Sequence, residues 1–117
     1  MRACVCSILE LPINEVPNFM ENGYHYYDEM INDFMDSKGL VSIEFSVEKE
    51  SDLDVWHNKL ADSYYIAVGK SPRADINHAV VYYGNKMVHD PHKDRAGIEN
   101  ILYVSLILKK DPSLKEI

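Results

Sequence analysis

The sequence predicts an α+β fold in which N-terminal helices pack on a mostly antiparallel sheet. Between Tyr24 and Lys38, apolar residues recur at three- and four-residue steps, which is the period of an amphipathic helix. From Val41 to Val47 they alternate with polar residues, which is the period of a half-exposed strand. Strand-like segments dominate the rest, and helices followed by a run of strands are typical of the α+β class. A chain of 117 residues suits one domain, and we expect residues 1–117 to form it.

Two further helical segments flank these elements. Ala3 to Glu10 predicts a short helix that ends before Pro12, because a residue preceding proline disfavours helical backbone. The segment from Ser51 to Ala61 is weakly helical, and Ser51 is its expected N-cap because its hydroxyl can accept a backbone N–H of the first turn.

The remaining strands follow in the second half of the chain. Tyr64 to Val68 is continuously apolar, which predicts a central strand covered on both faces. A polar loop from Gly69 to Asn77 follows it. Tyr103 to Leu108 is the last expected strand, and Lys109 to Ile117 is a polar tail that we expect to fray.

Composition limits the classes of partner. The formal net charge is −7 and no Lys/Arg cluster stands out, so we expect no nucleic-acid polymer as a partner. The apolar segment from Ala3 to Leu11 is too short to span a bilayer, and no membrane association is expected. Cys4 and Cys6 are spaced poorly for a mutual disulfide, which favours a reducing, cytoplasmic compartment. The sequence carries no information on the oligomeric state.

A β-hairpin carries the most informative polar residues. The apolar run from Ala79 to Tyr83 is followed by the turn signal Gly84-Asn85 and by a second strand that ends at Asp90. The two ends of a hairpin lie side by side, so His78 and Asp90 are expected within hydrogen-bonding distance. A carboxylate on one imidazole nitrogen fixes the tautomer and leaves the other nitrogen as a base.

Other polar and aromatic residues near this hairpin are candidates for ligand binding. Lys70, Ser71 and Arg73 precede His78 and are placed to hold an anionic ligand, although solvated loop charges are the commoner outcome. Tyr26 and Tyr27 cannot both face the core, so one of them is a candidate stacking surface. The expected ligand-binding residues are Lys70, Ser71, Arg73, Tyr26 and Asn77.

The histidines also allow a metal hypothesis, which we set aside. His78, His89, Asp90 and His92 include the imidazole and carboxylate groups that suit zinc. Neighbouring residues of a strand point to opposite faces, however, so His89 and Asp90 are not expected to bind one ion together. The sequence therefore predicts neither a metal site nor a cofactor. The alternative for His78 and Asp90 is a buried structural hydrogen bond.

The order of a helix with a cysteine near its start, then a strand-borne His and then an Asp resembles papain-like cysteine peptidases. The closest likeness is to the small bacterial and phage branch similar to bacteriocin-leader-processing peptidases. The matching pieces are Ala3-Cys4, the run Ser7-Ile8-Leu9-Glu10-Leu11-Pro12, Gly69 to Arg73, His78-Ala79-Val80-Val81 and Val88-His89-Asp90-Pro91-His92. The resemblance implies a papain-like fold, a bacterial or phage origin, and His78 and Asp90 as catalytic residues.

The chain departs from this family pattern at the nucleophile. The family's cysteine lies four residues before the position of Cys4, which falls before Met1, and its oxyanion-hole glutamine lies further upstream. Cys4 would lie about 6 Å further along the helix and is expected to be buried, so it is a weak catalytic candidate. Cys4 and Cys6 are more simply interpreted as small buried hydrophobes.

Two functional hypotheses follow. The first is a non-catalytic binding module, in which an old active-site cleft holds a small anionic metabolite, a peptide or a host protein. The second is a cysteine peptidase or acyl-transfer enzyme whose cysteine lies upstream of Met1 and which uses His78 and Asp90.

Overall fold

The computed structural model describes residues 1–111, in which five antiparallel strands form one sheet in the order β1-β5-β2-β3-β4. The helices are α1 (Arg2–Leu9), α2 (Tyr27–Ser37) and α3 (Glu50–Lys59), with two 3₁₀ turns, η1 (Ile13–Glu15) and η2 (Tyr24–Tyr26). The strands are β1 (Leu40–Ser46), β2 (Tyr64–Lys70), β3 (Asn77–Tyr83), β4 (Lys86–His89) and β5 (Ile101–Lys109). The α+β prediction is confirmed.

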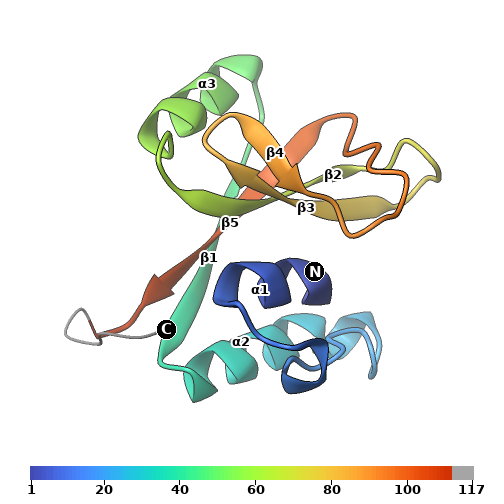
Figure 1. Ribbon diagram of the computed structural model, residues 1–117, viewed down its shortest axis with the longest axis vertical. Helices are drawn as coiled ribbons and strands as arrows, with labels where there is room; N and C mark the ends of the chain where they lie inside the picture. Colours follow the sequence, from blue (N-terminus) through green and yellow to red (C-terminus); the bar gives the residue numbers. More distant parts are fainter. Residues whose placement is uncertain (112–117) are drawn as a thin grey trace.

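The helices cover both faces of the sheet (Figure 1). On one face α1 packs against β2 and β3, and α2 packs against β1, around a core that includes Val5, Phe34 and Val81. On the other face Trp56 of α3 and Leu60, directly after the helix, pack near Tyr65 and Val80. The N-terminal helices therefore share one face, as the sequence predicts, and α3 forms a third layer.

Strand β2 is the central element, as its apolar run predicts. It pairs with β3 on one side and with β5 on the other. Ile66 and Val68 contribute to the core beneath α1 and α2, whereas Tyr65 and Ala67 contribute to the core beneath α3. Because both faces of β2 are covered, the strand does not alternate in polarity.

The predicted hairpin is formed by β3 and β4, joined at Gly84 and Asn85. Gly84 has φ 61°, in the left-handed region that favours glycine. A Cβ atom at this position would also lie 2.7 Å from the carbonyl oxygen of Ala61. The turn signal in the sequence therefore corresponds to a real steric requirement.

Several predicted boundaries are wrong by one to three residues. The expected helix from Tyr24 begins with the 3₁₀ turn η2 and becomes α-helical at Tyr27. Ser51 is not the N-cap of α3, because the Asp52 carboxylate accepts the backbone N–H of Lys49 and the helix begins one residue earlier.

The expected C-terminal tail also starts too early. Lys109 is the last residue of β5, where it pairs with Leu40, so the strand covers the first residue of the predicted tail. Residues 112–117, to which the rest of that prediction applies, lie outside the described part of the chain. Within residues 1–111, no helix has the length and apolar character needed to cross a membrane.

Candidate functional site

His78, near the start of β3, and Asp90, directly after β4, are joined by a hydrogen bond, as the hairpin predicts. The distance from His78 Nε2 to Asp90 Oδ1 is 2.7 Å. The side chain of Asp90 has no exposed surface, whereas that of His78 is 18% exposed. The carboxylate is thus shielded from water while one edge of the imidazole remains accessible.

The Asp90 carboxylate is held by the loop that follows it. Oδ1 also accepts the backbone N–H of His92 at 2.9 Å, and Oδ2 accepts the N–H of Gly97 at 2.8 Å. Burial of the carboxyl opposes its ionisation, but the hydrogen bonds from His78, His92 and Gly97 outweigh burial and lower the pKa of Asp90 to about 2. Asp90 is therefore a carboxylate at neutral pH.

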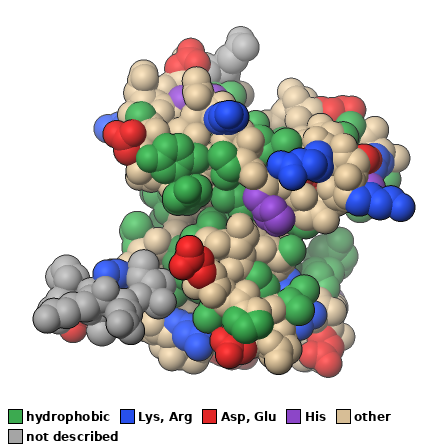
Figure 2. All heavy atoms as spheres, in the orientation of Figure 1, with side chains coloured by type: hydrophobic (Ala, Val, Ile, Leu, Met, Phe, Trp, Pro, Cys, Tyr) green, Lys and Arg blue, Asp and Glu red, His purple; other side chains and the backbone are tan. Residues whose placement is uncertain are grey.

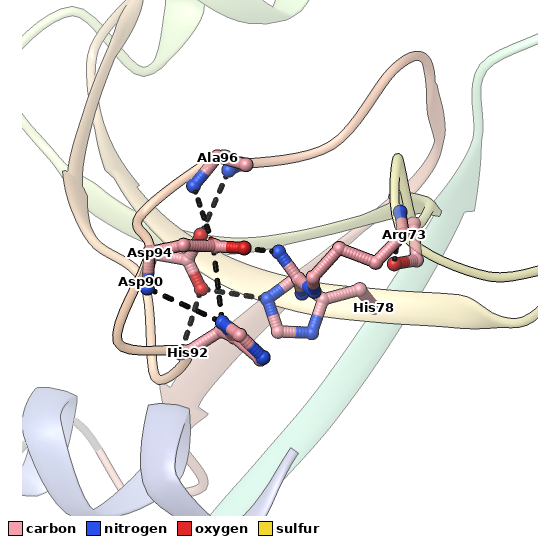
Figure 3. A network of polar contacts seen from close by, with 8 residues as sticks. Arg73, His78, Asp90, His92, Asp94 and Ala96 are labelled. Atoms are coloured by element: carbon pink, nitrogen blue, oxygen red, sulfur yellow. Dashed lines mark hydrogen bonds and ion pairs between the residues drawn. The ribbon is translucent and has the colours of Figure 1, made fainter.

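This arrangement defines the proton on the imidazole. An ionised carboxylate only accepts hydrogen bonds, so Nε2 of His78 must carry the proton and donate it to Asp90. In the neutral ring Nδ1 is then an acceptor. Among residues 1–111, no hydrogen bond involves Nδ1. Figure 3 shows the ring with its other nitrogen directed away from Asp90.

His78 borders a cleft of about 620 Å³ between α1, the segment before α2 and the start of β3. This volume lies within the range of small-molecule sites. The space-filling view shows an indentation between two parts of the surface (Figure 2). One part contains the sheet and α3, and the other contains α1 and α2. The lining is formed by Met1, Arg2, Asn18, Phe19, Met20, Tyr24, Tyr27, Val68, Asp75, Ile76, Asn77, His78, Ala79 and Tyr103.

The cysteines do not supply a reactive thiolate to this site. Cys4 is fully buried, as expected, in the core between the sheet and the helices α1 and α2. Burial raises the pKa of its thiol to about 11. Cys6 is half-buried and packs against the same core. Both are free thiols. The imidazole of His78 therefore lines the cleft, whereas neither cysteine does.

The polar loop before β3 holds its cations in ion pairs. Lys70 Nζ lies 2.9 Å from Asp75, and Arg73 Nη1 lies 2.8 Å from Asp94. Ser71 is buried, and its hydroxyl accepts the backbone N–H of Arg73. Lys70, Ser71 and Arg73 lie close to His78 in sequence, but none of them is part of the cleft lining.

The tyrosines are distributed differently from the prediction. Tyr27 contributes to the cleft, together with Tyr24 of η2. Tyr26 is half-exposed and lies outside the lining. One member of the Tyr26-Tyr27 pair therefore does face the cleft, and it is the second. Asn77 lines the cleft, so its role in ligand binding stays a prediction.

The sequence reasoning missed the loop that supports Asp90. Asp94 Oδ1 accepts the backbone N–H of Ala96 at 3.0 Å and lies 3.0 Å from His92 Nδ1. An Asp that bonds the N–H two residues on is a common turn feature, and the Asp94-Arg95-Ala96-Gly97 sequence carries that signal. The role of Gly97, which donates its N–H to Asp90, has no comparable local signal.

The structure brings together no group of three or more potential metal ligands among residues 1–111. Comparison with known proteins gives no further guide: no protein-family model, no curated protein and no solved structure matches this chain.

Proposed function

We propose that this chain is a binding module built on a degenerate papain-like cysteine-peptidase scaffold, with its ligand in the cleft beside His78. The observation that carries the proposal is a cleft of about 620 Å³ that is bordered by an oriented imidazole and lacks an activated thiol among the described residues. A site of this kind retains the means to recognise a ligand without a nucleophile to attack it.

The cleft suits a ligand with both apolar and polar groups. Phe19, Tyr27 and Tyr103 provide aromatic contacts, and His78 Nδ1 provides a hydrogen-bond acceptor. For an anionic group, the lining provides the guanidinium of Arg2, whose Nε and Nη2 donate to the carbonyls of Val16 and Ile13. Its Nη1 remains for a ligand. The proposed ligand is accordingly a small anionic metabolite or a peptide segment, including one from a host protein if the chain is of phage origin.

The test of this proposal is the reactivity of the two thiols. We expect labelling with a thiol-reactive electrophile between pH 5 and pH 9, followed by mass spectrometry, to modify the half-buried Cys6 first and Cys4 only slowly. The buried Cys4 thiol, with a pKa of about 11, is almost entirely protonated over this range. Rapid modification of Cys4 with an apparent pKa well below the free-thiol value of about 8.5 would contradict the proposal.

A second candidate function is supported by the hydrogen bond between His78 and Asp90 itself. A buried carboxylate that orients an imidazole is the arrangement of a general base, and a binding module has no need of it. We therefore also propose a cysteine peptidase or acyl-transferase whose cysteine is encoded before Met1. The test is the reading frame upstream: codons for a Gln and a Cys at the family spacing, and peptidase activity of the extended chain that H78A abolishes, would support it.

A further inference from the structure

We infer that Arg73 and Asp94 are positioning residues, whose ion pair holds the Asp90 loop so that Asp90 fixes the tautomer of His78. The inference rests on the proposed function in one respect, namely that His78 contacts a ligand in the cleft. The geometry involves residues on two loops that are far apart in sequence, at positions 71–76 and 90–97 (Figure 3).

The loop after β4 wraps around the Asp90 carboxylate. Its N–H groups at His92 and Gly97 donate to the two carboxylate oxygens, at 2.9 and 2.8 Å. The position of Asp90 therefore depends on the path of the chain from His92 to Gly97. A change in that path would move the Asp90 carboxylate and so lengthen its hydrogen bond to His78, because His78, His92 and Gly97 all donate to this one carboxylate.

Asp94 holds the middle of this loop. Its carboxylate accepts the N–H of Ala96, and its own backbone N–H lies 3.2 Å from His92 Nδ1. The next residue, Arg95, has φ 54°, a left-handed conformation that costs a non-glycine residue energy. The contacts of Asp94 on either side of this residue stabilise the tight turn.

Arg73 ties this loop to the one that leads into β3. Its guanidinium contacts Asp94 at 2.8 Å, and its backbone N–H donates to the buried hydroxyl of Ser71. The Arg73 and Asp94 side chains are 25% and 41% exposed, so this ion pair is less exposed than the Lys70–Asp75 pair but is still in contact with solvent. The ion pair thus joins the segment before His78 to the segment that holds Asp90.

The neighbouring ion pair offers a matched comparison. Lys70 and Asp75 also form an ion pair, near the same loop, but their side chains are 52% and 91% exposed. In the described part of the chain, neither side chain has a hydrogen bond or ion pair with the loop at positions 90–97. Loss of this pair removes a similar charge interaction without touching the support of Asp90.

The experiment measures the proton on His78 Nε2 by NMR of ¹⁵N-labelled protein at neutral pH. We expect R73M and D94N each to raise the rate at which this proton exchanges with water by about fivefold, because either change frees the loop that holds Asp90. The R73M/D94N double variant should show no more than the larger single effect, because both changes remove one interaction. R73K, which keeps the charge, should restore part of the protection.

The control is K70M, which removes the Lys70–Asp75 ion pair from outside the cleft lining and should leave the exchange rate within twofold of the wild type. Equal rates in R73M, D94N and wild type would overturn the inference, and so would an equal effect of K70M. If the proton exchanges too fast to follow, the ¹⁵N shifts of the two ring nitrogens decide, because they report the fraction of each tautomer. The exchange experiment uses no ligand, whereas the test of the proposed function measures the reactivity of Cys4 and Cys6. The two experiments can therefore fail independently.

Discussion

At the scale of single residues, His78 and Asp90 contribute unequally to stability, because only Asp90 is fully buried. D90A would leave the N–H groups of His92 and Gly97 without their acceptor, at about 1–3 kcal/mol for each buried unpaired group. H78A keeps both of those bonds and removes one hydrogen bond to a part-exposed ring. We expect chemical denaturation to show a loss of about 3 kcal/mol for D90A and about 1 kcal/mol for H78A.

The same pair of variants tests the structural alternative for His78. A loss of several kcal/mol in H78A would indicate that the imidazole mainly supports the fold. A small loss in both variants would contradict the buried environment of Asp90.

Asp90 also predicts a pH dependence of stability. Its pKa is lower in the folded chain, at about 2, than its ordinary value of 3.8, so folding favours the ionised form. This contribution is therefore fully present above about pH 5 and is lost as the pH falls towards 2. The expected loss is about 2 kcal/mol at this residue.

The measurement compares the free energy of unfolding of the wild type and D90N from pH 7 to pH 2.5. Other carboxyl groups titrate in both proteins, so the difference between the two curves isolates Asp90. Parallel curves would show that the Asp90 pKa is not lowered by folding.

At the scale of elements, the contact between β2 and the segment before β5 depends on Gly69. A Cβ atom at this position would lie 1.7 Å from the backbone carbonyl oxygen of Asn100. G69A is therefore expected to force the segment at positions 98–101 away from β2 and to lower the free energy of unfolding by about 3 kcal/mol, at the upper end of the overpacking range.

Gly23 provides the control for this substitution. It has φ 85°, but a Cβ atom there would meet no atom within 4 Å. With ψ 178° the residue lies in a region that essentially only glycine adopts, so G23A should cost the backbone strain alone, about 1–3 kcal/mol. Thermal unfolding of the two variants measures both effects. An unchanged unfolding midpoint in G69A would mean that the segment at Asn100 adjusts without cost.

The extent to which the sequence predicts these elements depends on how local their causes are. The hairpin was predictable because the Gly84-Asn85 turn and the apolar runs beside it lie within a dozen residues, and its geometry brings His78 to Asp90. The start of α3 was predicted wrongly although its cause is also local, because the Asp52 carboxylate accepts the backbone N–H of Lys49 and the N-cap is Lys49 instead of Ser51. The pairing of Arg73 with Asp94 was also missed, because 21 residues separate the two in sequence.

At the scale of the whole molecule, the two cores on opposite faces of the sheet share the same central strand. β2 contributes Ile66 to one core and Tyr65 to the other, so loss of the strand disrupts both. The periodicity of the sequence predicts which residues are buried, but the helix that covers each face depends on long-range packing. For this reason the sequence did not predict the face that α3 covers.

This arrangement predicts a single cooperative unfolding transition. Trp56 is the one tryptophan of the chain and reports the core beneath α3, whereas Cys4 reports the core beneath α1. We expect the midpoints from tryptophan fluorescence and from pulsed labelling of Cys4 to coincide in a denaturant titration. Separate midpoints would show that one layer of helices leaves the sheet before the other.

The hairpin that carries His78 and Asp90 also has a consequence for the order of folding. Its ends are only 12 residues apart, whereas β1 and β5 pair residues as distant as Leu40 and Lys109. Hairpins close within microseconds, and pairings between distant segments are slower because more chain entropy is lost first. During refolding we therefore expect the imidazole to meet its carboxylate before β1 joins the sheet, so the base is assembled while the rest of the sheet is still incomplete.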